Sequence, residues 1–113
     1  MLARPNRITR GSDYKAVVRR GRRCAAAHTV SYVSGGAAAE AGAVRFGFIV
    51  SKQVGSAVVR NTVRRRLKAV CAEALPGVRP GTDIVIRALP SSAGASFRDL
   101  RAEVSRCLAR SAA

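Results

Sequence analysis

The chain has 113 residues with 21 Lys and Arg against 6 Asp and Glu, which gives a formal net charge of +15 and a sequence pI near 11.7. This length suits one domain, and a hydrophobic content of 48% excludes a disordered basic tail, which would lack the apolar residues for a core. No run of about 18 apolar residues is present, and residues 1–7 contain no apolar signal segment, so we expect a cytoplasmic protein with no membrane partner.

The positive charge is concentrated in two stretches. Residues 1–23 contain eight basic residues and one acid, and residues 52–68 contain six basic residues and no acid. A compact domain with so many cations repels itself, and a polyanionic partner is the usual reason for tolerating that repulsion. Nucleic acid is the first candidate partner and an anionic membrane surface the second.

The first predicted helix follows a basic, extended segment. Residues 1–11 are predicted to be extended, and Ser12 is expected to cap a helix that ends near Arg20. Tyr14 and Val18 are four residues apart, which places them on one apolar face of this helix.

Two strands are predicted next. Residues 27–34 are rich in β-branched and aromatic side chains, and residues 43–51 give the strongest strand pattern in the chain. Residues 35–42, which are mostly Gly and Ala, are predicted to form a hairpin loop; the alternative, an alanine-rich helix, is disfavoured by the flanking glycines. Gly47 lies within the second strand, where a glycine often marks the close approach of another group.

A long amphipathic helix is predicted over residues 57–75, with Ser56 as its cap. A helical wheel gathers the apolar residues within about one third of the circumference. Arg60, Arg64 and Lys68 form a stripe along one edge of that apolar face.

The last predicted elements are a strand over residues 82–88 and a helix capped by Ser96. Both faces of this strand are largely apolar, so we expect it in the centre of the sheet. One more short strand is expected around residues 50–54. The order of elements predicts a single α+β domain over residues 1–113, with helices packed on one sheet.

The sequence offers few groups for catalysis or metal binding. It has a single histidine, His28, which we interpret as structural, and it lacks paired carboxylates at useful spacing and a phosphate-binding glycine loop. Cys24, Cys71 and Cys107 are far apart in sequence and include no C-x-x-C pair. We therefore expect all three to be reduced packing residues, and we predict no catalytic residue and no metal site in the protein.

The basic part of the long helix is the strongest candidate for a binding site. No acidic residue occurs between Glu40 and Glu73, whereas an ordinary solvent-exposed helix carries charges of both signs. Arginine side chains suit phosphates, and Asn61 among them suits a ribose hydroxyl or a base edge. We therefore favour an RNA-binding helix over a merely solvated one.

The residues from Arg45 to Arg65 read RFGFIVSKxVGxAVxRNxxRR and resemble the signature of the protein subunit of bacterial ribonuclease P. The resemblance extends over residues 5–110. It implies an α-β-β-β-α-β-α fold with a left-handed βαβ crossover, and a subunit of an endoribonuclease that removes the 5′ leader of precursor tRNA. It also implies that a catalytic RNA with bound Mg²⁺ performs the hydrolysis and that the protein alone is inactive.

The resemblance further implies roles for individual residues. Those expected to contact the catalytic RNA are Ser51, Lys52, Arg60, Asn61, Arg64, Arg65 and Lys68. Those expected to bind the precursor tRNA leader are Tyr14, Val18, Val30 and Tyr32. Additional basic contacts are expected from Arg7, Arg10 and Arg66. The implied partners are the catalytic RNA and precursor tRNA, with no protein partner required, and residues 1–10 are the candidate flexible segment in the absence of RNA.

The sequence departs from the family pattern at three positions. Thr62 stands where an arginine is usual, Gln53 replaces a usual lysine, and Val18 stands where an aromatic residue is common. The alternative function is that of a non-enzymatic ribosomal or RNA-assembly protein. A helix-turn-helix protein that binds DNA is disfavoured because the basic helix follows a strand, and a membrane-surface protein because the apolar helix face is needed for the core.

Overall fold

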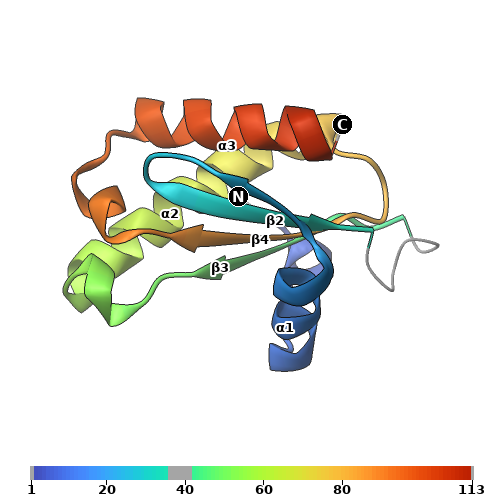
Figure 1. Ribbon diagram of the computed structural model, residues 1–113, viewed down its shortest axis with the longest axis horizontal. Helices are drawn as coiled ribbons and strands as arrows, with labels where there is room; N and C mark the ends of the chain where they lie inside the picture. Colours follow the sequence, from blue (N-terminus) through green and yellow to red (C-terminus); the bar gives the residue numbers. More distant parts are fainter. Residues whose placement is uncertain (1, 36–41, 113) are drawn as a thin grey trace.

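The structure is a computed structural model that describes residues 2–35 and 42–112. Its helices and strands are α1 (Gly11–Arg20), β1 (Arg22–Ala25), β2 (Thr29–Ser34), β3 (Arg45–Ile49), α2 (Ala57–Ala74), β4 (Asp83–Ala88) and α3 (Phe97–Ser111). This is the α-β-β-β-α-β-α order that the resemblance implies (Figure 1). Among the described residues, no helix combines the length and the apolar character needed to cross a membrane.

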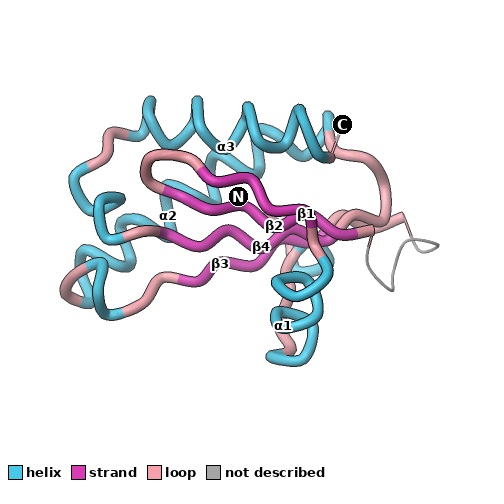
Figure 2. The backbone as a smooth tube through the Cα atoms, viewed as in Figure 1, coloured by secondary structure: helices cyan, strands magenta, loops and turns pink. Residues whose placement is uncertain are grey.

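The four strands form one mixed sheet in the order β1-β2-β4-β3 (Figure 2). β4 pairs antiparallel with β2 and parallel with β3, so it occupies the central position that its two apolar faces predict. Helix α2 connects the parallel strands β3 and β4. It lies behind the sheet in Figure 1, where both strands point left and β4 lies above β3, so the crossover is left-handed, the uncommon hand for such a connection.

Two predictions about the sheet are wrong. β2 and β3 do not form a hairpin, because β4 lies between them; most of the loop predicted over residues 35–42 lies outside the described residues. The additional strand is β1 rather than residues 50–54, where the chain instead forms the 3₁₀ turn η3 (Lys52–Val54). β1 is an edge strand with mostly exposed side chains, so it carries no alternation of apolar and polar residues that a pattern could detect.

The sequence signals predict the start of α2 and α3 but not of α1. The hydroxyl groups of Ser56 and Ser96 each accept a hydrogen bond from the backbone N–H three residues later, at 3.3 and 3.0 Å, as N-caps do. Helix α1 instead begins at Gly11, with Arg10 at the cap position. Ser12 therefore lies in the first turn, and its predicted role as the cap is wrong.

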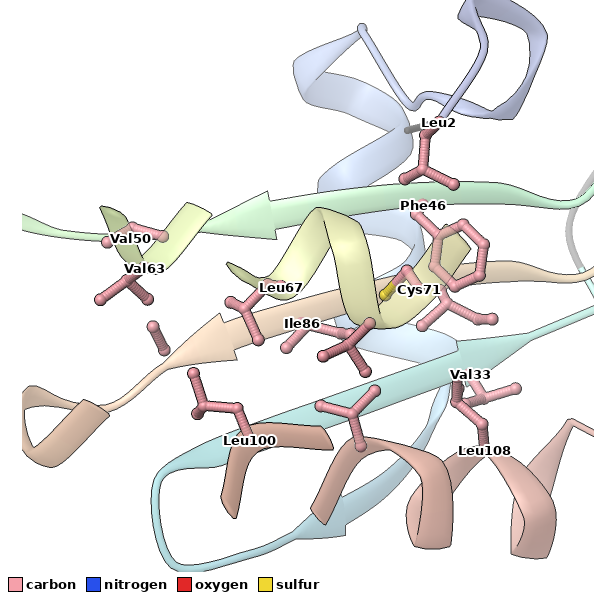
Figure 3. Close-up of a cluster of buried hydrophobic side chains, with 14 of the residues drawn as sticks. Leu2, Val33, Phe46, Val50, Val63, Leu67, Cys71, Ile86, Leu100 and Leu108 are labelled. Carbon is pink, nitrogen blue, oxygen red and sulfur yellow. The ribbon is translucent and has the colours of Figure 1, made fainter. Parts of the chain in front are cut away.

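The sheet separates two hydrophobic cores. On one face α2 and α3 cover the larger core, in which Phe46, Leu67, Ile86 and Leu100 are at most 1% exposed (Figure 3). On the other face α1 covers a smaller core formed by Ile8, Val17, Val30, Tyr32 and Val85. Truncating one of the fully buried leucines to alanine costs about 2–5 kcal/mol in comparable cores. Because α1 and α2 lie on opposite faces of the sheet, their side chains approach one another around its β3 edge.

The N-terminal segment runs along that edge. Leu2 is buried in the larger core beside Phe46 (Figure 3), and the backbone N–H of Ile8 donates to the carbonyl oxygen of Phe46 at 2.8 Å. The side-chain amide of Asn6 donates to the carbonyl of Val44 at 2.7 Å. These contacts give β3 a partner on its outer side and place the basic N-terminal residues near α2.

Cys24 and Cys107 are joined by a disulfide, so the prediction of three reduced cysteines is wrong for this pair. They are 83 residues apart in sequence, but β1 packs beside α3 and brings their Cα atoms to 5.8 Å, a separation that disulfides span. Cysteine spacing in the sequence indicates only pairs that are close along the chain, so it does not reveal this disulfide. Cys71 is free and buried as predicted, and burial raises the pKa of its thiol.

Candidate nucleic-acid interface

Helix α2 carries a row of polar side chains, which we call the basic stripe. The stripe consists of Arg60, Asn61, Arg64, Arg65 and Lys68. Intervals of four residues place Arg60, Arg64 and Lys68 along one side of the helix. One Nη of Arg64 donates to Oδ1 of Asn61 at 3.3 Å, and the other lies 3.5 Å from the carbonyl oxygen of Val50, the residue after β3. These contacts orient Arg64 towards the β3 edge of the sheet.

No carboxylate among the described residues pairs with the basic stripe. Glu73, the acid of α2, instead forms an ion pair with Arg101 on α3, with 2.9 Å between Oε2 and Nε. The stripe therefore presents uncompensated positive charge, as a surface that binds phosphates does.

Arg66 is separated from the stripe, although it is the sequence neighbour of Arg65. It lies on the opposite flank of α2, where its Nη1 donates to the carbonyl oxygen of Ala95 at 2.9 Å. The structure thus gives Arg66 an internal role in holding α2 against the segment before α3. Of the other additional basic residues, Arg10 is exposed at the start of α1, and Arg7 lies beside the stripe.

A hollow at the β3 edge connects the basic stripe to the N-terminal segment and α1. Its lining includes Arg7, Tyr14, Phe48, Arg64 and Lys68. Arg7 also donates twice to the carbonyl oxygen of Leu2, at 2.9 and 3.1 Å, which fixes its guanidinium in place. Cations from two separate parts of the chain therefore face one hollow that contains aromatic side chains.

The ring of Tyr14 is fixed against β3 at Gly47. A β carbon at residue 47 would lie 2.5 Å from a ring carbon of Tyr14, so a larger residue has no room there. The hydroxyl oxygen of Tyr14 accepts a hydrogen bond from the backbone N–H of Phe48 at 3.2 Å. This confirms the close approach that a glycine within the strand predicts, and it leaves Tyr14 partly exposed in a defined orientation.

A groove, which we call the α1 groove, leads from α1 across the sheet. Its first part has a volume of about 350 Å³ and is lined by Tyr14, Lys15, Val18, Arg19, Ile49 and Arg87. Ile49 and Arg87 also line an adjoining hollow that reaches Ser51 and Lys52, both exposed. Tyr14 lines both this groove and the hollow beside the basic stripe, so the two surfaces meet at its ring.

Val30 and Tyr32 lie beneath the groove rather than on its surface. They are 4% and 7% exposed and belong to the smaller core under α1. The guanidinium carbon of Arg87 lies 5.9 Å from the centroid of the Tyr32 ring, within reach of a cation–π contact. Tyr32 thus supports Arg87 from below, and the accessible surface is formed by side chains such as Tyr14, Val18 and Arg87.

Sequence reasoning missed four residues of the groove. Lys15 and Arg19 are one helical turn apart, beside Tyr14 and Val18, so the helix period alone could have indicated them. Ile49 and Arg87 are register partners on the parallel strands β3 and β4, and that pairing is not visible in the pattern of either strand.

Acidic groups near α1 are neutralised internally. Arg45 donates to both carboxylate oxygens of Asp83, at 2.7 and 2.9 Å, and to Asp13 at 3.3 Å. The pKa of the Arg45 guanidinium is raised above its ordinary value, mainly because of the hydrogen bond to Asp83. These carboxylates are therefore already paired. Within the described residues, no group of three or more His, Cys, Asp or Glu side chains is placed to hold a metal ion.

Comparisons with known proteins agree with this geometry. The family model described as Ribonuclease P matches residues 2–112. The ribonuclease P protein component of Clavibacter michiganensis is 51% identical over 110 residues, covering 97% of this chain and 96% of the relative. That of Acidothermus cellulolyticus is 46% identical over 110 residues, with 97% and 91% covered.

Solved structures show the same fold at low sequence identity. The RNase P protein of Staphylococcus aureus superposes with a TM-score of 0.82 at 22% identity, covering 93% of this chain and 94% of the other. The RNase P protein of Thermotoga maritima gives 0.79 at 18% identity, with 92% and 96% covered. The match to the family over residues 2–112, together with the full-length relatives, shows that this chain belongs to the ribonuclease P protein family.

Proposed function

We propose that this chain is the RNA-binding protein component of a ribonuclease P ribonucleoprotein, which removes the 5′ leader of precursor tRNA. The observation that carries this proposal is the meeting of two surfaces at Tyr14: the basic stripe of α2 on one side and the α1 groove on the other. One protein can thereby hold two RNA segments next to each other at the β3 edge.

The basic stripe is the proposed contact with the catalytic RNA. Arg60, Arg64, Arg65 and Lys68 suit the phosphates of a folded RNA, and Asn61 suits a 2′-hydroxyl. Thr62, at the position of the usual arginine, donates its hydroxyl to the carbonyl of Val58 at 3.0 Å and is occupied within the helix. Arg65 is exposed and lies one helical turn from Thr62, so it is the arginine available to contact RNA on that side of α2.

The α1 groove is the proposed binding site for the single-stranded leader. Unpaired RNA binds where cations follow its backbone and exposed rings contact its bases, and one base–aromatic stack contributes about 1–3 kcal/mol. Lys15, Arg19 and Arg87 supply the cations, and the fixed ring of Tyr14 supplies the aromatic surface. The groove continues to Lys52, which extends the positively charged path.

We propose that the RNA subunit and its bound Mg²⁺ supply the hydrolytic chemistry. The protein contributes by placing positive charge between two polyanions, which lowers their repulsion and reduces the Mg²⁺ concentration needed for assembly. On this view the protein alone cleaves no RNA.

Reconstitution tests this proposal directly. The purified protein, added to its cognate catalytic RNA at low millimolar Mg²⁺, is expected to speed the cleavage of precursor tRNA at the mature 5′ end. The protein alone and the RNA alone at that Mg²⁺ concentration are the controls. Tight RNA binding without any stimulation of cleavage would overturn the proposal and favour a non-enzymatic RNA-assembly protein.

Arg87→Gln tests the role of the α1 groove. We expect the holoenzyme with this variant to bind precursor tRNA several-fold more weakly, since a cation along the leader path is lost, and to bind mature tRNA as before. Arg98→Gln, an exposed arginine on α3, is the matched control. Equal weakening for both tRNAs would contradict a leader-specific groove.

A further inference from the structure

A second basic hollow lies at the edge of the sheet opposite to β3. It has a volume of about 250 Å³ and is lined by Arg22, Arg23, Cys24, Ala25, Arg110 and Ser111. Its walls are the edge strand β1 and the last turn of α3, which lie beside each other in Figure 2. β1 and β3 are the two ends of a four-stranded sheet, so three strand spacings, about 14 Å, separate this hollow from the β3 edge.

The disulfide explains why arginines from distant parts of the chain meet here. Cys107, Arg110 and Ser111 are spaced by three and four residues, so they share the face of α3 that lies towards β1. On β1, Arg22 and Cys24 are two residues apart and share one side of the strand. The bond between Cys24 and Cys107 therefore holds Arg22 and Arg110 on facing walls of the hollow.

The charge of this hollow is uncompensated within the described residues. Asp13 and Asp83 pair with Arg45, Glu73 pairs with Arg101, and Glu103 contacts His28. The remaining described acid, Asp99, lies in the first turn of α3, about 16 Å along the helix from Arg110. No described carboxylate pairs with Arg22, Arg23 or Arg110, which are all exposed.

The last described carbonyl of the α3 end has a hydrogen-bond partner within the protein. The carbonyl oxygen of Ala112 accepts a hydrogen bond from the backbone N–H of Arg79 at 2.6 Å, so this terminal acceptor has its own partner. Arg110 in the last turn offsets the partial negative charge of the helix C-terminus. The helix end carries only a partial charge, so Arg110 and the two arginines of β1 all remain as cations for an external anion.

We propose that this hollow binds the phosphate backbone of RNA and forms a second RNA contact, remote from the basic stripe. The identity of the ligand as RNA rests on the proposed function. Because the hollow lies at the opposite edge of the sheet, it receives a different RNA segment from those at the stripe and the α1 groove. Charged residues on edge strands also prevent strand-to-strand aggregation. If the arginines of β1 had only this protective role, their removal would leave RNA binding unchanged.

Two arginines of the same helix provide the test. Arg110→Gln removes a cation from the hollow, and Arg98→Gln removes another exposed cation about three turns away. In one arm, the affinity of each variant for the catalytic RNA is measured as a function of salt. In the other arm, the affinity of preassembled holoenzymes for precursor tRNA is measured as a function of salt. The first arm reports a contact with the catalytic RNA, and the second a contact with the substrate.

The slope of log K against log salt concentration is negative. We expect Arg110→Gln to reduce its magnitude by about 0.7–0.9 in one of the two arms, and Arg98→Gln to leave it unchanged in both. Arg22→Gln/Arg23→Gln should lower the slope in the same arm by about twice that amount, with melting temperatures close to wild type. Identical behaviour of Arg110→Gln and Arg98→Gln in both arms would overturn the second contact. If the wild-type protein bound no catalytic RNA at all, the proposed function and this inference would both fail.

Discussion

Gly47 shows how one missing side chain shapes the site. The absence of a β carbon lets the Tyr14 ring cross β3, where its hydroxyl accepts from the N–H of Phe48. A tyrosine on an exposed helix surface would sample several rotamers, and ordering it on binding would cost entropy. The glycine therefore pre-orients the ring that separates the α1 groove from the hollow beside the basic stripe.

Gly47→Ala is expected to destabilise the protein by about 1–3 kcal/mol, because the new methyl group collides with the Tyr14 ring. Urea unfolding measures the change. In a Tyr14→Ala background the collision partner is gone, so the cost of Gly47→Ala should largely disappear. The same cost in both backgrounds would show that the strand, rather than the ring, requires glycine.

At the scale of the element, α2 combines three functions on one helix. Its apolar face, with Val63, Leu67 and Val70, is buried in the larger core. Arg64 and Lys68 of its basic stripe line the hollow at the β3 edge, and its far flank is tied to Ala95 through Arg66. Adjacent residues on a helix are about 100° apart, so neighbouring arginines serve different purposes.

Arg65→Ala and Arg66→Ala are expected to affect different properties, RNA binding in the first case and stability in the second. Arg65 is exposed, so its loss should leave stability near wild type, weaken binding to the catalytic RNA and reduce the salt slope by about 0.7–0.9. Loss of Arg66 removes the hydrogen bond to Ala95 and should lower the free energy of unfolding by about 1 kcal/mol, with RNA affinity retained. Salt-dependent RNA binding and urea unfolding of both variants separate the two roles. An unchanged slope for Arg65→Ala would remove this residue from the interface.

At the scale of the whole molecule, long-range bonds hold the edge strand β1 and the β1–β2 turn against α3. Besides the disulfide, the buried carboxylate of Glu103 on α3 accepts from the backbone N–H of His28 at 2.9 Å and from the hydroxyl of Thr29 at 3.2 Å. The ring of His28 also contacts the hydroxyl of Ser91 at 2.9 Å. His28 is thus held through its backbone by Glu103 and through its ring by Ser91, in line with its interpretation as structural.

Thiol titration tests the disulfide. The denatured, unreduced protein should show one reactive thiol per chain, that of Cys71, and the reduced protein should show three. Reduction should lower the free energy of unfolding by about 2–4 kcal/mol, because the unfolded chain regains the entropy of an 83-residue loop. In Cys24→Ser/Cys107→Ser, reductant should have no effect on stability. Three reactive thiols before reduction would contradict the bond.

The sequence by itself determined the features that depend on local periodicity and capping. The buried and basic faces of α2, the caps at Ser56 and Ser96, the central place of β4 and the close approach at Gly47 could all be predicted, because each depends on residues a few positions apart or on the polarity of one strand. The family resemblance supplied the order of the elements and the left-handed crossover, but not the position of the additional strand, which the residue patterns misplaced.

Tertiary structure alone decided the features that join distant segments. The packing of β1 against α3, the bond between Cys24 and Cys107, the place of Arg87 in the α1 groove and the burial of Tyr32 all depend on contacts between segments far apart in the chain. Such contacts form only when the sheet and helices bury their apolar faces together, and no local pattern encodes that choice. The +15 charge is accordingly a property of the sequence, whereas its division between two opposite edges of the sheet is a property of the fold.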